Sequence, residues 1–230
     1  NYQLQLIWAR TFGKHDVSAM GVFARQETAW GNMIPNYRED WVFRATYAYG
    51  GKYFFEYNGA YNGSEKFSPD NRFAFFNSGA VGWMLSEEPF MKYFREKKLI
   101  DMLKIRASYG EIGDDNVGGR FLYMDQWAYG GSTPMDVNQG GSPYTWYRES
   151  SVGNENVHWE KVRKFNVGID YGFLGGLLAG AIEIFQDKRT DILVQGSQRA
   201  VPAYFGQSPP TANLGEVKTN GYEIEVRFNK

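Results

Sequence analysis

Apolar and polar residues alternate along much of the chain with a period of two. In residues 53–62, for example, Phe55 and Tyr57 stand on either side of Glu56. A period of two predicts β-strands with one apolar and one polar face. We therefore predict about nine antiparallel strands. The alternating runs lie at 2–10, 16–26, 41–49, 53–62, 103–109, 164–171, 178–187 and 222–228, the first two being less regular.

The connections between these runs are of two kinds that take turns along the chain. Tight links at Gly13-Lys14, at Gly50-Gly51 and at 172–176 alternate with long links at 28–40, 63–71, 111–158 and 192–212. A soluble β-sandwich also has strands with one hidden face. Outer-membrane barrels, however, combine short periplasmic turns with long extracellular loops. The connections therefore favour an all-β fold, an antiparallel transmembrane β-barrel.

One connection on the short-turn side has a helical rather than a turn-like composition. Residues 86–100 begin with Ser86 as a candidate N-cap and end with Lys97 and Lys98, which suits the two ends of the helix dipole. We predict one short periplasmic helix here. Its apolar stripe is expected to pack against the barrel rim, and a membrane anchor or a partner groove is the alternative; the stripe consists of Phe90, Met91 and Phe94.

Composition narrows the class of function. Aromatic residues make up 17% of the chain and mean hydropathy is -0.51, while no apolar run approaches the roughly 20 residues of a membrane-spanning helix. The chain has no cysteine, and His15 and His158 lie in separate connections. We therefore expect no metal site and no cofactor. A net charge of -1 gives no basic footprint for nucleic acid.

The number of strands bears on domain organisation. An odd count of about nine strands differs from the even count of a complete bacterial barrel. We therefore expect residues 1–230 to form a portion of a single barrel domain. No compact segment within the chain has the character of a plug, so the plug and the barrel ends are expected to lie outside this chain.

Several stretches resemble a known family. Residues 55–91 read FEYNGAYNGSEKFSPDNRFAFFNSGAVGWMLSEEPFM and residues 103–116 read LKIRASYGEIGDDN. With WEKVRKFNVGIDYG at 159–172, DKRTDIL at 187–193 and NLGEVKTNGYEIEV at 213–226, the chain resembles the SusC/RagA family of TonB-dependent transporters of Bacteroidetes. The resemblance covers the chain from about residue 53 to its end.

The resemblance implies a function and a set of partners. A family member has a barrel of about 22 strands, a size associated with plugged transporters, with an N-terminal plug and a segment that contacts TonB. Such a protein lies in the outer membrane of a Gram-negative bacterium. It takes up glycans or peptides together with a SusD-like surface lipoprotein, and it does no chemistry on them. The TonB contact would belong to an N-terminal region outside this chain.

The long connection at 111–158 contains the best candidates for binding. Aromatic rings among hydrogen-bonding Gly, Ser and Asn residues suit the capture of a sugar or a peptide. They equally suit packing within the loop or against a SusD-like lid. The candidate residues are Trp127, Tyr129, Tyr144, Trp146 and Tyr147.

Two further readings remain open from the residues alone. A soluble or surface glycan-binding β-sandwich, or an adhesin, would use the apolar rows as its core. A glycoside hydrolase would need two carboxylates facing each other at roughly 5 to 9.5 Å, and no pair stands out by spacing, so we expect no enzyme activity. A charged row is expected to form a structural network, with a substrate path as the alternative; the row consists of Lys104, Arg106, Lys164 and Asp170.

Overall fold

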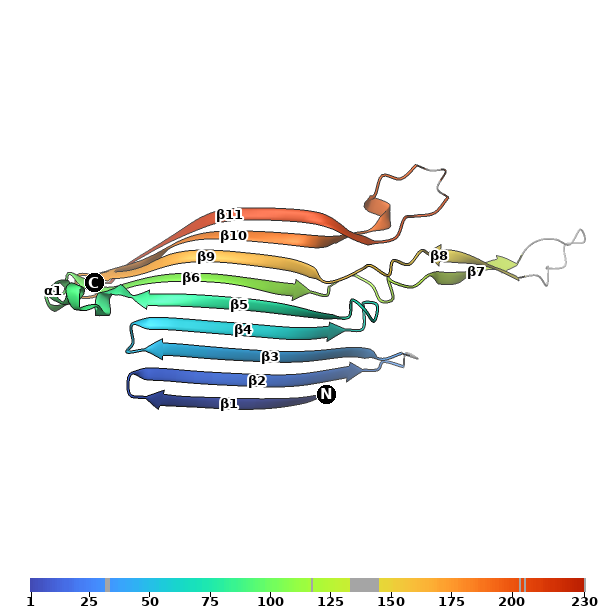
Figure 1. Ribbon diagram of the computed structural model, residues 1–230. Helices are drawn as coiled ribbons and strands as arrows, with labels where there is room; N and C mark the ends of the chain where they lie inside the picture. The colour runs from blue at the N-terminus through green and yellow to red at the C-terminus, as the bar shows by residue number, and fades with distance from the viewer. Residues whose placement is uncertain (32–33, 117, 133–144, 203, 205, 230) are drawn as a thin grey trace, which may run out of the picture.

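Nine strands form one open antiparallel sheet in the computed structural model, which describes residues 1–31, 34–116, 118–132, 145–202, 204 and 206–229 (Figure 1). The sheet follows the order of the chain, with neighbours paired from β1 to β6 and then through β9, β10 and β11. The prediction of about nine antiparallel strands is confirmed. The strands are β1 (Tyr2–Phe12), β2 (His15–Thr28), β3 (Asn36–Tyr49), β4 (Tyr53–Ser64), β5 (Phe73–Met84), β6 (Ile100–Asp114), β9 (Glu160–Phe173), β10 (Leu178–Val194) and β11 (Ala212–Phe228).

The strand β5 is the one that alternation did not reveal. Its positions on one face hold Phe75, Val81 and Trp83, as in the other strands. The opposite face carries small residues such as Ala80 and Gly82 instead of charged ones. Without a polar contrast, the period of two is hard to detect in the sequence, although the backbone pairs on both sides.

The register joins the apolar rows of all nine strands into one surface, which we call the apolar face. Residues directly opposite each other in a pair of strands share a face. Ile105 lies opposite Ile169, and Ile169 lies opposite Ile182. No second sheet packs on this face within the described ranges, and most of its side chains are exposed. It includes Leu4, Phe23, Trp41, Phe43, Phe55, Tyr61, Phe75, Trp83, Ile105, Tyr109, Phe165, Ile169, Ile182 and Ile224.

One glycine on the apolar face is required by close packing. Gly59 lies opposite Phe43, whose ring lies across the glycine backbone. A Cβ atom at position 59 would stand 2.1 Å from Cζ of Phe43, far closer than van der Waals contact. Because Gly59 has no side chain, the ring of Phe43 can occupy the space above its backbone.

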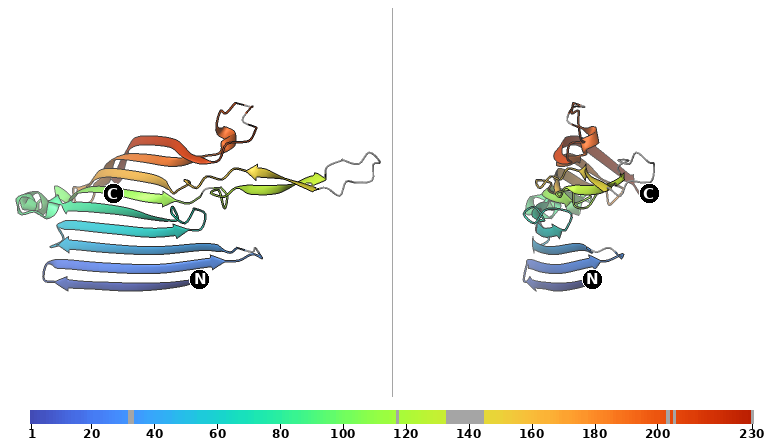
Figure 2. Two further views of the ribbon diagram at one scale, coloured as in Figure 1. Left: turned by 45° about the vertical axis from the view of Figure 1, so that its right-hand side comes forward. Right: turned by 90° about the vertical axis from the view of Figure 1, so that its right-hand side faces the viewer.

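The connections at the two ends of the strands differ sharply in length. At the turn end, β1–β2, β3–β4 and β9–β10 are joined by only a few residues, and Gly13 and Gly50 adopt positive φ there. At the loop end lie the connections 29–35, 65–72, 115–159 and 195–211. Figure 2 shows the longest of these projecting well beyond the strand ends. The asymmetry of short and long connections expected from the sequence is present.

The connection between β5 and β6 contains the one short helix that the sequence predicts, but the helix covers fewer residues than expected. It consists of two short 3-10 turns, η1 (Leu85–Glu87) and η2 (Pro89–Met91), followed by α1 (Lys92–Glu96). Ser86 is buried and its side chain caps no helix. The helix begins later because Glu88 precedes a proline, which disfavours helical backbone, and Glu88 is extended with φ -72° and ψ 148°.

The helix ends in a well-defined C-terminal motif. Lys98 has φ 54°, and its N–H donates to the carbonyl of Arg95 at 2.9 Å. The N–H of Leu99 donates to the carbonyl of Phe94, also at 2.9 Å. These two bonds form a Schellman motif, which satisfies carbonyls that the last turn leaves open. Among the described residues, no helix has the length and apolar character needed to cross a membrane.

The largest buried hydrophobic cluster lies at the loop end. Phe67, Phe76 and Trp159 pack together with Val157, and Trp159 is 2% exposed. The indole N–H of Trp159 donates to the carbonyl of Arg72 at 3.1 Å, so its polar group is satisfied. This cluster ties the connection 65–72 to the start of β9.

Candidate functional site

The connection 115–159 folds back on itself as a two-stranded hairpin, β7 (Gln126–Ser132) and β8 (Thr145–Ser151). Tyr129 lies directly opposite Tyr147, and their ring centroids are 6.0 Å apart. Trp127 is two positions before Tyr129, so it shares the same face. We call these three residues the aromatic triad. They are 58–68% exposed, which makes them a surface feature and not a core.

Trp146, another candidate from the sequence, does not join the triad. Trp146 lies across Gly130, where a Cβ would stand 2.4 Å from the indole ring. Trp146 therefore covers the hairpin backbone on the side away from Tyr147, its neighbour in the strand. Tyr144 lies outside the described residues. The structure thus brings together Trp127, Tyr129 and Tyr147 of the five predicted residues.

The start of the connection 115–159 is attached to two neighbouring loops. The guanidinium of Arg120 donates to the carbonyls of Ile34 and Pro35 at 3.2 and 3.1 Å. Lys66 donates through Nζ to the carbonyl of Asp115 at 2.8 Å. Because these acceptors are backbone carbonyls, the contacts fix the course of the chain itself.

The end of the same connection is attached as well. The side-chain amide of Asn154 donates to the carbonyl of Thr211 at 2.9 Å. The amide of Asn213 donates to the carbonyls of His158 and Asp191 at 2.8 and 2.6 Å. The hairpin therefore projects from a base whose two ends are bonded to other loops and to the sheet.

A polar cleft of about 700 Å³ lies between the hairpin and the connection 195–211. Gln207 crosses it, donating through Nε2 to Glu149 at 3.0 Å. The sequence analysis did not single out the connection 195–211, which forms the second side of this cleft. The signal available was the density of hydrogen-bonding and turn residues in QGSQ at 195–198 and GQSPP at 206–210. The lining includes Arg148, Glu149, Ser150, Gln195, Ser197 and Gln207.

The face of the sheet opposite the apolar face, which we call the polar face, carries paired charges. Arg106 binds Asp170 at 3.2 Å and also binds Glu183. Lys164 binds Asp187 at 3.3 Å. The charged row expected from the sequence thus makes a network across β6, β9 and β10. The fourth member, Lys104, lies 5.2 Å from the ring centroid of Phe54.

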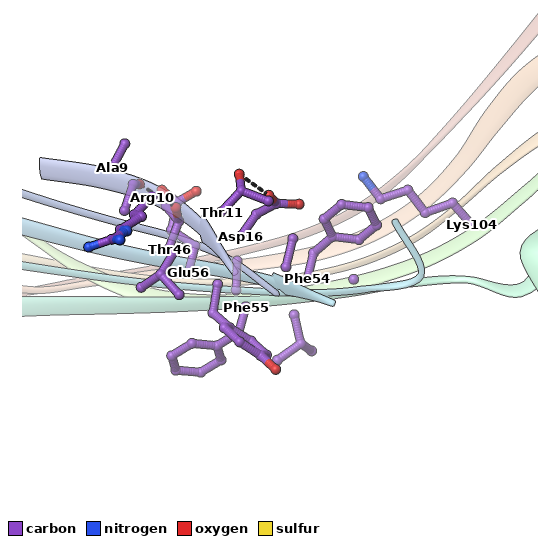
Figure 3. Close-up of a pocket in the computed structure, with 16 residues that line it drawn as sticks. Ala9, Arg10, Thr11, Asp16, Thr46, Phe54, Phe55, Glu56 and Lys104 are labelled. Atoms are coloured by element: carbon purple, nitrogen blue, oxygen red, sulfur yellow. Dashed lines mark hydrogen bonds between the residues drawn. The ribbon is translucent and has the colours of Figure 1, made fainter. Parts of the chain in front are cut away.

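A hollow of about 410 Å³ lies near the turn end of β1 to β6 (Figure 3). Figure 3 shows Phe54 and Lys104 on one side of the sheet and Phe55 on the other. The hydroxyl of Thr11 donates to Asp16 at 2.6 Å at the edge of the hollow. Phe54 and Phe55 are neighbours in β4, yet the ring of Phe54 lies on the polar face and the ring of Phe55 on the apolar face.

Neither histidine takes part in a cluster of possible metal ligands. The imidazole of His15 is hydrogen-bonded to the hydroxyl of Tyr47 at 2.8 Å, and Nδ1 of His158 is 2.7 Å from the carbonyl oxygen of Asn156. Within the described residues, no group of three or more His, Asp or Glu side chains is placed to hold a metal ion.

Comparison with known families identifies the kind of barrel to which the nine-stranded sheet belongs. The profile described as "TonB dependent receptor-like, beta-barrel" matches residues 9–229. The chain belongs to this family of TonB-dependent receptor β-barrels. The resemblance to the SusC/RagA group is confirmed by a similarity to TonB-dependent receptor SusC of Bacteroides thetaiotaomicron, with 31% identity over 208 residues, 88% of this chain and 19% of that protein.

Further relatives agree with this assignment. TonB-dependent receptor P3 of Formosa agariphila is 29% identical over 183 residues, which is 80% of this chain and 17% of that protein. The chain thus spans about a fifth of the length of the curated relatives it matches. Membership of a barrel family rules out the β-sandwich that the sequence left open. The apolar face is therefore the outer surface of a membrane barrel.

Solved structures support the fold. The RagAB peptide importer in the closed-closed state superimposes with a TM-score of 0.81 at 17% identity, covering 98% of this chain and 27% of that chain. The open-open state of the same importer gives a TM-score of 0.77, also at 17% identity, covering 97% and 26%. At this identity the likeness concerns the arrangement of strands.

Proposed function

We propose that the protein containing this barrel segment imports glycans or peptides across the outer membrane of a Gram-negative bacterium, energised through TonB and together with a SusD-like lipoprotein. The observation that carries the proposal is the continuous wall of nine strands with one uncovered apolar face. Such a surface is typical of a barrel wall that faces lipid. Its family membership and its likeness to SusC support import as the activity.

Residues 1–230 form part of one barrel domain in this proposal. The edges of β1 and β11 that face away from the sheet have no partner strand in the described structure. Backbone groups cannot remain unpaired in hydrocarbon. Further strands would therefore pair with both edges, and the hollow on the wall near the turn end would face the plug that the family resemblance implies.

The loop end is the proposed site of contact with cargo or with the lipoprotein. The aromatic triad offers flat apolar surfaces that suit a sugar ring or an apolar peptide side chain. The cleft beside it offers hydrogen-bonding groups such as Arg148 and Gln207. Together they favour a polar substrate with some apolar surface, which fits both oligosaccharides and peptides.

The protein is proposed to do no chemistry on its cargo. A hydrolytic pair needs one carboxylate free to donate a proton and a second one ionised across the scissile bond. The carboxylates of Asp170 and Glu183 instead share one partner, Arg106. Glu160 is likewise bound by Arg189 and accepts the N–H of Leu193 at 3.0 Å. These groups stabilise the wall.

The first experiment tests location and partnership. The full-length protein is expressed with a tag, membranes are fractionated, and co-purifying proteins are identified by mass spectrometry. We expect a heat-modifiable band in the outer membrane and a co-purifying lipoprotein. A soluble protein without a partner would overturn the proposal.

A second experiment assigns the aromatic triad. Trp127→Ala combined with Tyr147→Ala removes two exposed rings and leaves the hairpin backbone pairing intact. We expect about tenfold weaker binding of either the cargo or the lipoprotein, as for aromatic residues in an interface. Isothermal calorimetry with oligosaccharides and peptides measures the first, and co-purification measures the second.

The matched control is Trp30→Ala, which removes an indole that is 80% exposed in another loop at the same end. Weaker cargo binding only in the triad variant assigns the triad to the substrate. A loss of lipoprotein alone assigns it to the lid. If both variants bind like the unmodified protein, the triad has no role in binding.

A further inference from the structure

Apolar side chains gather at the turn end of the sheet, in the connection between β5 and β6 and in the turn between β9 and β10. The sequence predicts that the stripe in this connection packs on the rim, but only Met91 is buried. Phe90 and Phe94 are exposed, Phe90 by 63%. We call the exposed side chains the rim patch; it consists of Phe90, Tyr93, Phe94, Leu99 and Leu174.

Backbone contacts hold the rim patch together. The Schellman motif at the end of α1 brings Leu99 next to Phe94, a pair that commonly makes a hydrophobic contact in this motif. The N–H of Leu174 donates to the carbonyl of Leu99 at 3.3 Å. The rings of Tyr93 and Phe94 are 5.6 Å apart. The patch therefore spans two connections that are far apart in the sequence.

The carboxylate of Glu88 shows on which side of the wall this connection is attached. It accepts the hydroxyl of Tyr53 at 2.6 Å and the indole N–H of Trp83 at 3.1 Å. Tyr53 and Trp83 lie opposite each other and belong to the apolar face. The connection is therefore fastened to the apolar face of the sheet, and the rim patch lies just beyond the strand ends.

Charge distinguishes the rim patch from the apolar face. Residues 85–99 contain four basic and three acidic side chains. Each carboxylate has a cationic partner: Glu87 binds Arg95, Glu88 binds Lys52 at 3.2 Å, and Glu96 binds Lys92 at 3.6 Å. The remaining lysines are Lys97, whose Nζ lies 4.7 Å from the ring centroid of Tyr93, and Lys98.

We propose that the rim patch lies in the headgroup region of the periplasmic leaflet and binds its phospholipids, with Lys97 and Lys98 beside their phosphates. Tyrosine is enriched in this region because its ring is apolar and its hydroxyl is polar, which fits Tyr93. Phe and Leu side chains beside it can bury in the boundary between headgroups and acyl chains. Basic side chains next to an apolar surface favour anionic headgroups. This inference rests on the proposed outer-membrane location, and it adds a surface for lipid that no transport step requires.

Photo-crosslinking in cells tests the proposal directly. The photoreactive residue benzoylphenylalanine replaces Phe90 in the full-length protein, and its adducts are identified by mass spectrometry after irradiation. We expect phospholipid adducts. The neighbouring residues Phe54 and Phe55 provide matched controls, because they lie on opposite faces of β4 (Figure 3).

The controls separate failure of this inference from failure of the proposed location. Phe55 should give lipid adducts and Phe54 should give none. Protein adducts at Phe90 together with lipid adducts at Phe55 overturn the rim-patch inference alone and identify a protein partner. An absence of lipid adducts at Phe55 overturns the proposed location and the inference with it.

A charge variant tests the role of the lysines without altering an apolar residue. Lys97→Gln combined with Lys98→Gln should lower the share of phosphatidylglycerol among the adducts at Phe90 roughly twofold to fivefold at low salt. The share at Phe55 should not change. The measurement uses protein reconstituted in vesicles of phosphatidylethanolamine and phosphatidylglycerol. An unchanged share at Phe90 contradicts the assigned role of the lysines.

Discussion

The sheet and the hairpin β7–β8 are both antiparallel and both aromatic, yet they use aromatic residues in opposite ways. In the sheet, each interior strand pairs on two sides, and its rings form part of a continuous surface that ends only at the sheet edges. Among the described strands, the two strands of the hairpin pair only with each other, and its triad stands exposed on a projecting arm. An exposed ring therefore belongs to a continuous apolar surface in the sheet, but to a small isolated group on the hairpin.

The charged groups of the two regions differ in the same way. On the polar face of the sheet, Arg106 bridges Asp170 and Glu183, which come from two other strands. In the hairpin, Glu149 is reached by Gln207 from a separate loop across a cleft. Charges in the wall thus join strands that are already paired, whereas those in the hairpin hold two loops at a set distance.

The largest expected difference between the regions concerns two tryptophans. Trp159→Ala removes a ring that is 2% exposed and packed against Phe67 and Phe76, and should lower the free energy of unfolding by about 3–5 kcal/mol. Trp127→Ala removes a ring that is 68% exposed and should change it by less than about 0.5 kcal/mol. Urea unfolding of the full-length barrel in vesicles measures both. Equal effects would contradict the division into a packed base and an exposed arm.

A charge placed on the apolar face should have the next largest effect. Ile105→Arg puts a guanidinium between Trp83 and Ile169, at a cost of about 2–4 kcal/mol at mid-membrane depth. Ser108→Arg on the same strand is the control, because position 108 lies on the polar face, opposite Ala80 and Asn166. The folded fraction on gels run without heating gives the comparison. Equal folding of both variants would show that the faces are assigned wrongly.

The smallest expected effect concerns Glu88 at the turn end. Hydrogen bonds from Tyr53 and then from Trp83 hold the pKa of the Glu88 carboxyl below its ordinary value. A lowered pKa stabilises the folded state above the ordinary value, and this contribution is lost as the pH falls through the lower folded value. The protection of amides in residues 85–99 against hydrogen exchange, taken relative to the intrinsic exchange rate at each pH, should therefore fall below about pH 4.5.

The conservative variant isolates this carboxylate. Glu88→Gln keeps the size of the side chain and removes its titration, so protection in residues 85–99 should already be lower at neutral pH and should change less on acidification. Glu96→Gln is a suitable control, because its one ionic contact among the described residues is the exposed pair with Lys92. A pH response that persists in Glu88→Gln would assign the effect to other groups.

The sequence is a good guide where strands have contrasting faces. The runs at 53–62 and 178–187 lie within β4 and β10, because alternation of rings with charged or amide side chains reports both the period and the face. It missed β5, where small residues on the polar face remove the contrast. It also placed the helix too early, since the effect of Pro89 on Glu88 outweighed the capping signal of Ser86.

The candidate site was predictable only as a composition. The sequence singled out aromatic residues in the connection 111–158, but it could not say which of them share a face. Pairing of Tyr129 with Tyr147 across the hairpin decided that, and the placement of Trp146 over Gly130 excluded Trp146 from the triad. The second wall of the cleft comes from residues far away in the sequence, and only folding brings them near.

The sequence by itself determined the period of the strands, the chemistry of their two faces and the alternation of short and long connections. These are local properties, because each depends on neighbouring residues and on the geometry of an extended backbone. The tertiary structure decided which strands pair, which rings stand together on the hairpin and on which side of the wall the rim patch is fastened. These features depend on contacts such as the hydrogen bond between Glu88 and Tyr53, which stabilise the protein only after folding brings distant segments together.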